Sequence, residues 1–489
     1  MRTRFGPQGA DYAEKFARIV GAEGVLSGPA AERAYDCDAY SVDRSAPALV
    51  LLPRSTNEVC EIVAACLESN IPYTARGAGT GLSGGALPAL GGLVISTKKL
   101  TQILEIDLAN RAMRAQCGVT NKKLSDAVRQ DGLHFAPDPS SQTVSTLGGN
   151  IGENAGGPHT LKYGVTAPHV LGVTMVTPEA EVLELGGKVA GLAGSELIGL
   201  IVGSEGTLGI VTEAWVRLTV VPTHVETALI AFPSVRQATE TVSEIIAGGI
   251  IPCALELIDH GILGALRAAF NLQYPEGTQA MLLVECDNGG QGVAGTTADE
   301  VRSDIRRISE LCERNGAIHV RVAKDEAERA KLWEARKKGV GAMGRLAPSV
   351  VTHDGVIPRS RLPEMLDFVY AVAAEHNVGV ANIFHAGDGN LHPCFYFDDR
   401  DPQQVERVVE AGEAVIRKCI ELGGSVSGEH GIGVEKLDLM ALMFTEDDLA
   451  LQQRAKTVFN RGELCNPCKV LPNQKSCVEH RKRWRGVAW

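Results

Sequence analysis

The sequence predicts an α+β protein of two or three domains, and three observations lead to this prediction. The chain has 489 residues, more than one hydrophobic core usually supports. Its 54 glycines are concentrated in a few clusters, which indicates loops whose backbone binds a ligand. In the middle of the chain, helical patterns alternate with single apolar strands, as in a layered α+β domain.

The N-terminal part combines helices, short strands and glycine loops. Residues 56–70 have the pattern of an amphipathic helix, for which Thr56 or Asn57 is the expected cap. Strands are expected in the segments IPYTARG and GLVIST, on either side of a loop from Gly77 to Gly91. A helix is expected over 120–131, a hairpin over 170–185 with Pro178 in its turn, and a strand after GSEGTLG. The segment LGGNIGENAGGPHTLKYG contains too much glycine for a regular element.

The pattern changes around Val221 and Pro222. From about residue 225 to 415, helices of about 12 to 18 residues alternate with the strands CALELI, AMLLVEC, VGVANIF and HPCFYF. This alternation predicts helices on one face of an antiparallel sheet. The last part of the chain, with GGSVSGEHGIG and FNRGELCNPCKVLP, is again rich in loops.

Charge and hydropathy exclude several function classes. The formal net charge of -11 argues against nucleic acid as the main partner, because phosphate backbones require a basic surface. The basic stretch His480–Arg485 is either a solvated tail or a contact for a membrane surface or an acidic partner. No stretch has the pattern of a signal peptide or a transmembrane segment. We therefore expect a cytoplasmic protein.

The twelve cysteines are expected to be mostly reduced thiols in that compartment. Cys465-x-x-Cys468, with Cys477 and His480 nearby, can be read as a zinc or redox motif. Pro467 inside the pair and the lack of a second Cys-x-x-Cys favour a plain C-terminal turn instead.

Three glycine runs point to a cofactor. Gly79–Gly84 matches the dinucleotide-binding pattern G-x-G-x-x-G, but in that fold a helix begins inside the motif. Here Pro88 and Gly91-Gly92 prevent a helix, so a nest of backbone N–H groups around a diphosphate is the better interpretation. Similar runs at Leu147–Gly157 and Gly203–Gly209 indicate one large, extended, phosphate-bearing cofactor.

Two histidines flank another glycine-containing turn. Between His385 and His392 lie Gly387 and Gly389, which argue against a continuous helix. Two strands joined by this turn would bring the imidazoles together, although such a pair alone is more often not a metal site. The motif Gly428-Glu429-His430-Gly431 adds a carboxylate and a third imidazole. Two histidines and a carboxylate with open coordination positions suit a catalytic Zn²⁺, Mn²⁺ or Fe²⁺.

Five segments occur in a recognisable order and spacing: ARGAGTGLSGGALP, APDPSSQTVSTLGGNIGENAGG, VGSEGTLGIVTEA, FHAGDGNLHP and SGEHGIGVEK. The chain resembles the FAD-linked oxidases of the vanillyl-alcohol-oxidase type from about residue 40 to 475. Among them it is most similar to the FAD-binding subunit of glycolate oxidases and to D-lactate dehydrogenases. The resemblance implies an FAD-binding domain over 1–222, a substrate cap with an antiparallel sheet over 223–421, and a C-terminal segment over 422–489 that returns to the FAD-binding domain.

The same resemblance implies which residues bind FAD. The diphosphate would contact Arg76, Gly77, Ala78, Gly79, Thr80, Gly81, Leu82, Ser83 and Gly84. The flavin and its ribityl chain would contact Pro137, Asp138, Ser141, Gly148, Gly149, Asn154 and Gly157. The adenine side would contact Glu205, Gly206 and Ile210. Relatives with covalently bound flavin commonly carry a histidine in the first glycine loop, where this chain has Ala78, so we expect non-covalent FAD.

Catalytic roles also follow from the resemblance. His385, His392 and Glu429 would bind the divalent metal, and His430 would be the catalytic base. Arg336, in the segment LWEARK, would bind the substrate carboxylate through its planar fork of donors. Asn390 would contact the substrate or the metal shell.

The expected reaction is the oxidation of a small 2-hydroxy acid to the 2-oxo acid. A metal lowers the pKa of the substrate hydroxyl, so that a neutral imidazole can accept its proton, and the flavin accepts the hydride. Relatives that oxidise D-2-hydroxyglutarate carry a lysine where this chain has Thr352, which favours glycolate or D-lactate over a dicarboxylate.

The electron acceptor is expected to be a partner. The chain has no cysteine set for an iron–sulfur cluster, and the resemblance to glycolate oxidase implies a separate iron–sulfur subunit and, through it, a membrane quinone. This would place the protein at the membrane periphery. Three alternatives remain: a dehydrogenase of D-2-hydroxyglutarate or another 2-hydroxy acid, a nicotinamide-dependent 2-hydroxy-acid dehydrogenase, and a flavin-binding subunit that is inactive alone.

Overall fold

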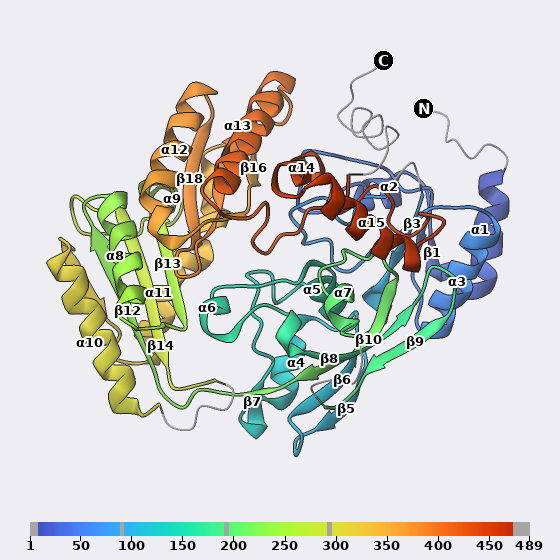
Figure 1. The fold of residues 1–489 in the computed structure, drawn as a ribbon, viewed down its shortest axis with the longest axis horizontal. Helices are drawn as coiled ribbons and strands as arrows, with labels where there is room; N and C mark the ends of the chain where they lie inside the picture. Colours follow the sequence, from blue (N-terminus) through green and yellow to red (C-terminus); the bar gives the residue numbers. More distant parts are fainter. Residues whose placement is uncertain (1–7, 89–91, 190–194, 291–295, 473–489) are drawn as a thin grey trace. The chain divides into compact units, whose positions relative to one another are not determined.

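The computed structural model describes residues 8–88, 92–189, 195–290 and 296–472. Its chain divides into two compact units, and Figure 1 shows their elements. Unit 1 comprises Met1–Ala155, Val165–Thr219 and His430–Trp489, and unit 2 comprises Gly156–Gly164 and Val220–Glu429. The short segment Gly156–Gly164 thus leaves unit 1 and returns to it, which was not predicted from the sequence. The stretch His480–Arg485 and Cys477 lie outside the described residues.

A four-stranded sheet forms the N-terminal part of unit 1. Its strand order is β1 (Val25–Leu26), β2 (Val50–Leu51), β4 (Leu93–Ser96), β3 (Tyr73–Arg76). It is accompanied by α1 (Gln8–Val20), α2 (Pro29–Tyr35) and α3 (Thr56–Glu68). The predicted cap of α3 was wrong: Ser55 precedes the helix in an extended conformation, and its side chain accepts a hydrogen bond from the N–H of Glu58.

A five-stranded antiparallel sheet forms the second part of unit 1. Its strand order is β5 (Ile103–Asp107), β6 (Ala112–Gln116), β10 (Ile210–Arg217), β8 (Val170–Val176), β9 (Val182–Gly186). The hairpin of β8 and β9 and the strand β10 confirm the predictions for these segments. The same unit contains the short strand β7 (Leu133–His134) and the helices α4 (Asn121–Val128) and α7 (Ile198–Ile201).

Helix α5 (Leu147–Glu153) contradicts the prediction that the second glycine run forms no regular element. The hydroxyl of Thr146 accepts a hydrogen bond from the N–H of Gly149 at its start, and Asn154 closes its end with φ 54°. Gly148 permits close packing, since a Cβ there would lie 2.8 Å from the Cβ of Cys117. Two caps and tertiary contacts therefore stabilise a helix that glycine disfavours by its intrinsic propensity.

Unit 2 is built on a nine-stranded sheet. Its main strand order is β15 (His319–Val322), β12 (Val225–Phe232), β14 (Ala280–Asp287), β13 (Ala254–Asp259), β18 (Gly379–His385), β19 (Asn390–Leu391), β17 (Gly355–Val356). Off this path, β20 (Pro393–Phe397) pairs with β16 (Ser349–Thr352) and with β18. Neighbouring strands run antiparallel, which confirms the predicted sheet type.

Helices cover both faces of this sheet, so the prediction of helices on one face was wrong. Every residue of β13 and β14 is buried, although successive side chains of a strand point to opposite faces. On one face, Ile258 and Met281 pack against α9 (His260–Phe270) and α11 (Glu326–Ala342). Contacts of the sheet with α8 (Val235–Ala247), α10 (Ala298–Arg314) and α12 (Leu362–Glu375) account for the burial of the other face. Apolar runs such as AMLLVEC are typical of such two-sided coverage.

Unit 2 also contains α6 (Thr160–Tyr163) and α13 (Pro402–Glu421), and unit 1 ends with α14 (Met440–Met443) and α15 (Glu446–Phe459). The predicted strands β13, β14, β18 and β20 all form in unit 2. In the part of the chain that the structure describes, no helix is both long and apolar enough to cross a membrane.

The Cys465-x-x-Cys468 motif lies in a buried turn of unit 1. Ten described cysteines, Cys465 among them, have free thiols, whereas Cys468 is disulfide-bonded. The Cys465 thiol donates a hydrogen bond to the carbonyl oxygen of Gly206 at 3.1 Å, and burial raises its pKa to about 12. A protonated, buried thiol has a structural role, whereas the disulfide at Cys468 was not predicted by the interpretation of this motif as a plain turn.

Candidate active site

Two histidines face each other across a tight turn of the nine-stranded sheet. His385 ends β18, residues 386–389 form the turn, and Asn390 pairs back with His385. The rings of His385 and His392 have centroids 5.1 Å apart and planes nearly perpendicular, at 87°. Gly389 has φ 79°, and a Cβ there would lie 2.2 Å from the carbonyl oxygen of Ile357, so glycine is required in this turn. The structure confirms that two strands and a glycine turn bring these imidazoles together.

Glu429 joins the two histidines. Its Oε1 lies 3.0 Å from Nε2 of His385 and 3.1 Å from Nε2 of His392. All three side chains belong to unit 2, where the histidines are buried and Glu429 is half-buried. The sequence-predicted ligand set therefore comes together, although its members are up to 44 residues apart in the chain.

Asp354 positions Glu429, a role that was not predicted from the sequence. It follows strand β16 and is fully buried. Its Oδ2 accepts hydrogen bonds from the hydroxyl of Ser427 at 2.6 Å and from the N–H of Gly428 at 2.7 Å. The N–H of Glu429 also points to this carboxylate, at 3.2 Å. Three donors on one buried carboxylate hold the loop that presents Glu429.

A second buried carboxylate, Glu256, links the cluster to Arg336. Glu256 lies in β13 and its side chain is completely buried. Its Oε1 lies 2.7 Å from Nδ1 of His385, and its Oε2 accepts a hydrogen bond from Nε of Arg336 at 2.5 Å. Arg336 is itself buried on α11. Glu256 was also missed, although a lone acidic residue in the apolar strand CALELI is a usable signal, since such residues are rarely buried without a partner.

Opposite charges govern the ionisation of this cluster. Burial opposes ionisation of Glu256, but His385 and Arg336 together hold its pKa below the usual value. Burial would lower the pKa of His385, yet Glu256 and Glu429 outweigh it and raise that pKa well above the usual value. Burial likewise opposes ionisation of Glu429, and both histidines hold its pKa well below the usual range. Two ionised carboxylates thus flank the His385 imidazole, and they would stabilise a metal cation at its Nε2 as they stabilise its proton.

The three ligand groups fit a divalent metal. One ligand atom from each of His385, His392 and Glu429 lies within 4.8 Å of the other two, a separation that one ion can bridge. The bond from His385 Nδ1 to Glu256 leaves Nε2 directed at the cluster, as metal-binding histidines require. Two imidazoles and one carboxylate leave further coordination positions open, which suits Zn²⁺, Mn²⁺ or Fe²⁺.

Asn390, another predicted site residue, lies beside the cluster, and Thr352 lies on the neighbouring strand β16. Asn390 is buried, and a Cβ on Gly428 would lie 2.3 Å from its Oδ1, so the amide packs directly against the loop that carries Glu429. Thr352 pairs with Cys394 across β16 and β20, and its hydroxyl lies 3.4 Å from the Cys394 sulfur.

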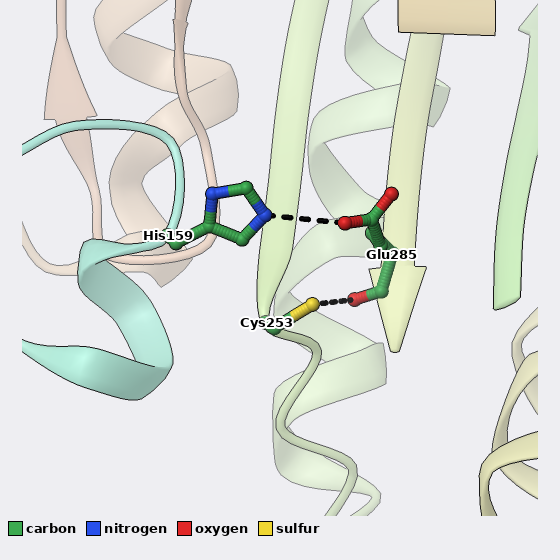
Figure 2. Close-up of side chains that lie close together, drawn as sticks. All are labelled: His159, Cys253 and Glu285. Atoms are coloured by element: carbon green, nitrogen blue, oxygen red, sulfur yellow. Dashed lines mark hydrogen bonds and ion pairs between the residues drawn. The ribbon is translucent and has the colours of Figure 1, made fainter. Parts of the chain in front are cut away.

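Figure 2 shows another group with metal-ligating atoms, formed by His159, Cys253 and Glu285 of unit 2. His159 Nε2 lies 3.2 Å from Glu285, whose backbone carbonyl accepts a hydrogen bond from the Cys253 thiol at 3.2 Å. Arg329 binds both oxygens of the Glu285 carboxylate at 2.9 Å. Since Trp333 and Thr227 also donate to this carboxylate, we interpret Glu285 as the centre of a structural network and not as a metal ligand.

The first glycine loop, in unit 1, has the features of an anion nest. From Ala78 to Ser83, no backbone N–H donates a hydrogen bond to an acceptor within the described part of the chain, and residues 77–82 are partly or fully exposed. Gly79 and Gly84 have φ 75° and 79°. No helix begins in the described part of this loop, residues 77–88, which argues against the nicotinamide alternative. Successive unoccupied N–H groups fit the diphosphate of FAD.

The other two glycine runs meet the first one in unit 1. A Cβ on Gly77 would lie 2.4 Å from Oγ1 of Thr146, at the start of α5. The N–H of Gly203 donates to Ile151 and the N–H of Glu205 donates to Gly152, both at 2.8 Å. The three glycine runs thus form contiguous surfaces, as a single extended cofactor requires.

The predicted FAD contacts divide unevenly between the two units. Gly157 belongs to the segment of unit 2, and the others belong to unit 1: Arg76, Gly77, Ala78, Gly79, Thr80, Gly81, Leu82, Ser83, Gly84, Pro137, Asp138, Ser141, Gly148, Gly149, Asn154, Glu205, Gly206 and Ile210. The guanidinium of Arg76 is buried beside the first loop, and a Cβ on Gly79 would lie 2.2 Å from its Nη2.

The predicted base, His430, is the first residue of the C-terminal part of unit 1. The loop that follows it is held by Glu205, whose carboxylate accepts hydrogen bonds from the N–H groups of Ile432 and Gly433 at 2.6 and 2.8 Å. The unit boundary falls between Glu429 and His430. Glu429, a candidate metal ligand, therefore belongs to unit 2, and His430, the candidate base, belongs to unit 1.

Comparisons with known proteins agree with these features. Residues 47–186 match the model of an FAD binding domain, and residues 221–470 match that of the C-terminal domain of FAD linked oxidases. The glycolate oxidase subunit GlcD of Escherichia coli K12 is 41% identical over 445 residues, which cover 91% of this chain and 88% of that protein. GlcD of Bacillus subtilis is 37% identical and covers 94% of this chain and 97% of that protein. A D-lactate dehydrogenase of Anaerostipes hadrus is 32% identical, with coverages of 94% and 97%.

Solved structures confirm the predicted fold. 4-Ethylphenol oxidase from Gulosibacter chungangensis superimposes with a TM-score of 0.76 at 19% identity, over 96% of this chain and 98% of that one. p-Cresol methylhydroxylase superimposes with a TM-score of 0.77 at 15% identity, over 94% and 96% of the two chains. These neighbours have the vanillyl-alcohol-oxidase-type fold, which the chain shares.

Proposed function

Because this chain belongs to the family of FAD-linked oxidases and is an FAD-dependent oxidoreductase, we propose that it oxidises a small 2-hydroxy acid with the help of a divalent metal. The observation that carries the proposal is the convergence of His385, His392 and Glu429 on one point. Arg336 is attached to this cluster through Glu256. A metal site next to a buried arginine suits a substrate that carries a hydroxyl and a carboxylate on adjacent carbons.

Each side chain has a distinct task in this proposal. When bound, FAD accepts a hydride and a divalent cation lowers the pKa of a nearby alcohol. His385, His392 and Glu429 hold the cation. Arg336, which uses Nε for Glu256, offers its two terminal nitrogens to the substrate carboxylate.

His430 is the proposed base. The hydroxyl proton goes to its imidazole, and the hydrogen on the same carbon leaves as a hydride, so the carbinol carbon becomes the carbonyl of the 2-oxo acid. Its position next to Glu429 in the chain lets it face the hydroxyl without being a ligand. A neutral imidazole is a suitable base near pH 7, because its ordinary pKa is about 6.5.

Glycolate and D-lactate are the proposed substrates. The relatives named as glycolate oxidase subunits and D-lactate dehydrogenase cover more than nine-tenths of this chain. Thr352 offers a hydroxyl and no charge where a second carboxylate would need a cation, which favours a monocarboxylate over a 2-hydroxy dicarboxylate.

We further propose that the reduced flavin passes its electrons to a partner protein with an iron–sulfur cluster. The support is that GlcD of Escherichia coli is itself named a subunit of glycolate oxidase. Non-covalent binding of FAD belongs to the same proposal, and it rests on Ala78 in the first glycine loop. The alternative of a flavin-binding subunit that is inactive alone is opposed by the complete set of metal and arginine groups in unit 2.

Anaerobic reduction of the bound flavin tests the proposal. The purified protein is mixed without oxygen with glycolate, D-lactate, L-lactate and D-2-hydroxyglutarate in turn, and flavin absorbance is followed. We expect rapid bleaching by glycolate or D-lactate and slow bleaching by D-2-hydroxyglutarate. A flavin that none of the four acids reduces, in protein that contains stoichiometric metal, would contradict the proposed activity.

A further inference from the structure

One fully buried carboxylate serves both the metal cluster and the arginine. Glu256 Oε1 lies 2.7 Å from Nδ1 of His385, and Oε2 lies 2.5 Å from Nε of Arg336. Each oxygen thus has a donor from a different functional group. The side chain of Glu256 is completely buried, and those of Arg336 and His385 are only 7% and 5% exposed. Water therefore does not compete for these two hydrogen bonds.

This arrangement determines the orientation of both groups. A proton on Nδ1 of His385, held by Glu256, leaves the lone pair of Nε2 for a metal. A hydrogen bond from Nε of Arg336 fixes the plane of the guanidinium and leaves Nη1 and Nη2 for a bidentate carboxylate. Both groups therefore depend on one side chain of β13.

We infer that Glu256 is a positioning residue that aligns His385 for metal binding and Arg336 for binding of the substrate carboxylate. The inference rests on the proposed function and adds a residue to it. Through Glu256, a metal ligand and the carboxylate-binding arginine are anchored to the same side chain of β13.

The chemistry of the carboxylate is required at this position. An amide of the same shape has one oxygen acceptor and one NH₂ donor, whereas His385 and Arg336 both present donors. In Glu256→Gln, one of the two partners must therefore lose its acceptor, or His385 must change tautomer and place a proton on Nε2. Either change misaligns the metal ligand or the arginine. Aspartate keeps two acceptor oxygens but is shorter by one methylene.

The neighbouring strand offers a matched control. Glu285 in β14 is also a buried carboxylate, and it also binds an arginine of α11, Arg329. No interaction joins it to His385 or Arg336 among the described residues. Glu285→Gln therefore makes the same chemical change, against the same helix, without affecting either functional group.

The test compares Glu256→Gln, Glu256→Asp and Glu285→Gln with the wild-type holoprotein. Zn²⁺ is titrated into chelator-treated protein to measure its affinity, and KM and kcat are measured after metal is restored. In Glu256→Gln we expect metal affinity to fall by about 10- to 100-fold and KM to rise by about tenfold or more. Glu256→Asp should recover part of both losses. Glu285→Gln should lower the melting temperature and leave Zn²⁺ affinity and KM within about threefold of wild type.

The outcomes separate this inference from the proposed function. Wild-type protein that binds no metal would overturn the proposed function. Wild-type protein that binds Zn²⁺ and is reduced by its substrate, with Glu256→Gln equal to it in Zn²⁺ affinity and KM, would overturn only the role of Glu256. If Glu256→Gln does not fold, Glu256→Asp decides: wild-type Zn²⁺ affinity and KM in that variant would make Glu256 a stability residue and overturn the inference.

Discussion

The carboxylate of Glu205 accepts a hydrogen bond from the backbone N–H of Ile432 at 2.6 Å. The next N–H, of Gly433, donates to the same carboxylate at 2.8 Å. Glu205 was predicted as a contact for the adenine side of FAD, but its side chain is buried and used within the protein. The third glycine run thus holds the loop that begins at His430, and the proposed base is positioned by a residue 225 positions earlier in the chain.

Glu205→Gln should therefore slow turnover while metal content stays normal. The amide offers only one oxygen acceptor, so one of the two N–H groups loses its partner, which costs about 1–3 kcal/mol and loosens the loop. We expect kcat to fall by about tenfold to a hundredfold. Metal content, measured by elemental analysis, should not change because the metal ligands lie in unit 2.

Glu153→Gln is the matched control for that variant. Burial, followed by repulsion from Glu205 and Asp38, raises the pKa of Glu153 well above its usual value, which favours the neutral form of this carboxyl group. Its amide should therefore behave like wild type in kcat. Equal losses in both variants would show that the loop depends on packing in this region and not on the bonds to Glu205.

Metal binding and proton abstraction should separate in two histidine variants. His385→Ala should lose the metal together with activity, because it removes one of three ligands. His430→Ala should keep FAD and metal but lose about 10²- to 10⁴-fold in rate. Elemental analysis, flavin absorbance and flavin reduction by substrate provide the three readouts. Undiminished turnover by His430→Ala would rule out this histidine as the base.

Bound flavin should leave the protein on acid precipitation. Purified protein should show the two visible absorption bands of oxidised flavin, and acid should release the colour into the supernatant because Ala78 offers no side-chain attachment point. A yellow pellet after extraction would mean that another residue is bonded to the flavin.

The network around Glu285 should make unit 2 sensitive to acid. Burial opposes ionisation of this carboxylate, but His159 and Arg329 outweigh it and hold its pKa well below the ordinary value of 4.5. Because the pKa is lower in the folded state, ionised Glu285 stabilises the fold above about pH 4.5, and this stabilisation is lost as the pH falls below that value.

Thermal unfolding of wild type and Glu285→Gln tests this dependence. The melting temperature of the variant should be clearly lower at pH 7, and the difference should shrink towards pH 4 as the wild-type carboxylate starts to lose its advantage. A difference that stays constant over this range would show that the loss comes from packing and not from charge.

Local patterns in the sequence were sufficient for much of the fold and for the identity of the site residues. The hairpin β8/β9 and the single strands of unit 2 follow from apolar runs and turn residues, which act over a few positions. The two-strand geometry around His385 and His392 follows from Gly387 and Gly389, because glycine excludes a stable helix there and allows a tight turn. Helix α5 was missed because its caps and packing outweigh the low propensity of its glycines.

Only the tertiary structure decided which distant residues act on the site. Tens to hundreds of positions separate Glu256, Asp354 and Glu205 from their hydrogen-bond partners. No local sequence pattern predicts which donors will bind a buried carboxylate. The segment Gly156–Gly164 belongs to unit 2 for the same reason, since Lys162 and Tyr163 bind Asp287 there. The sequence by itself determined the chemical groups, the cofactor class and the turns that carry them. Chain folding decided which buried charges orient these groups, because such interactions depend on distances in space and not along the chain.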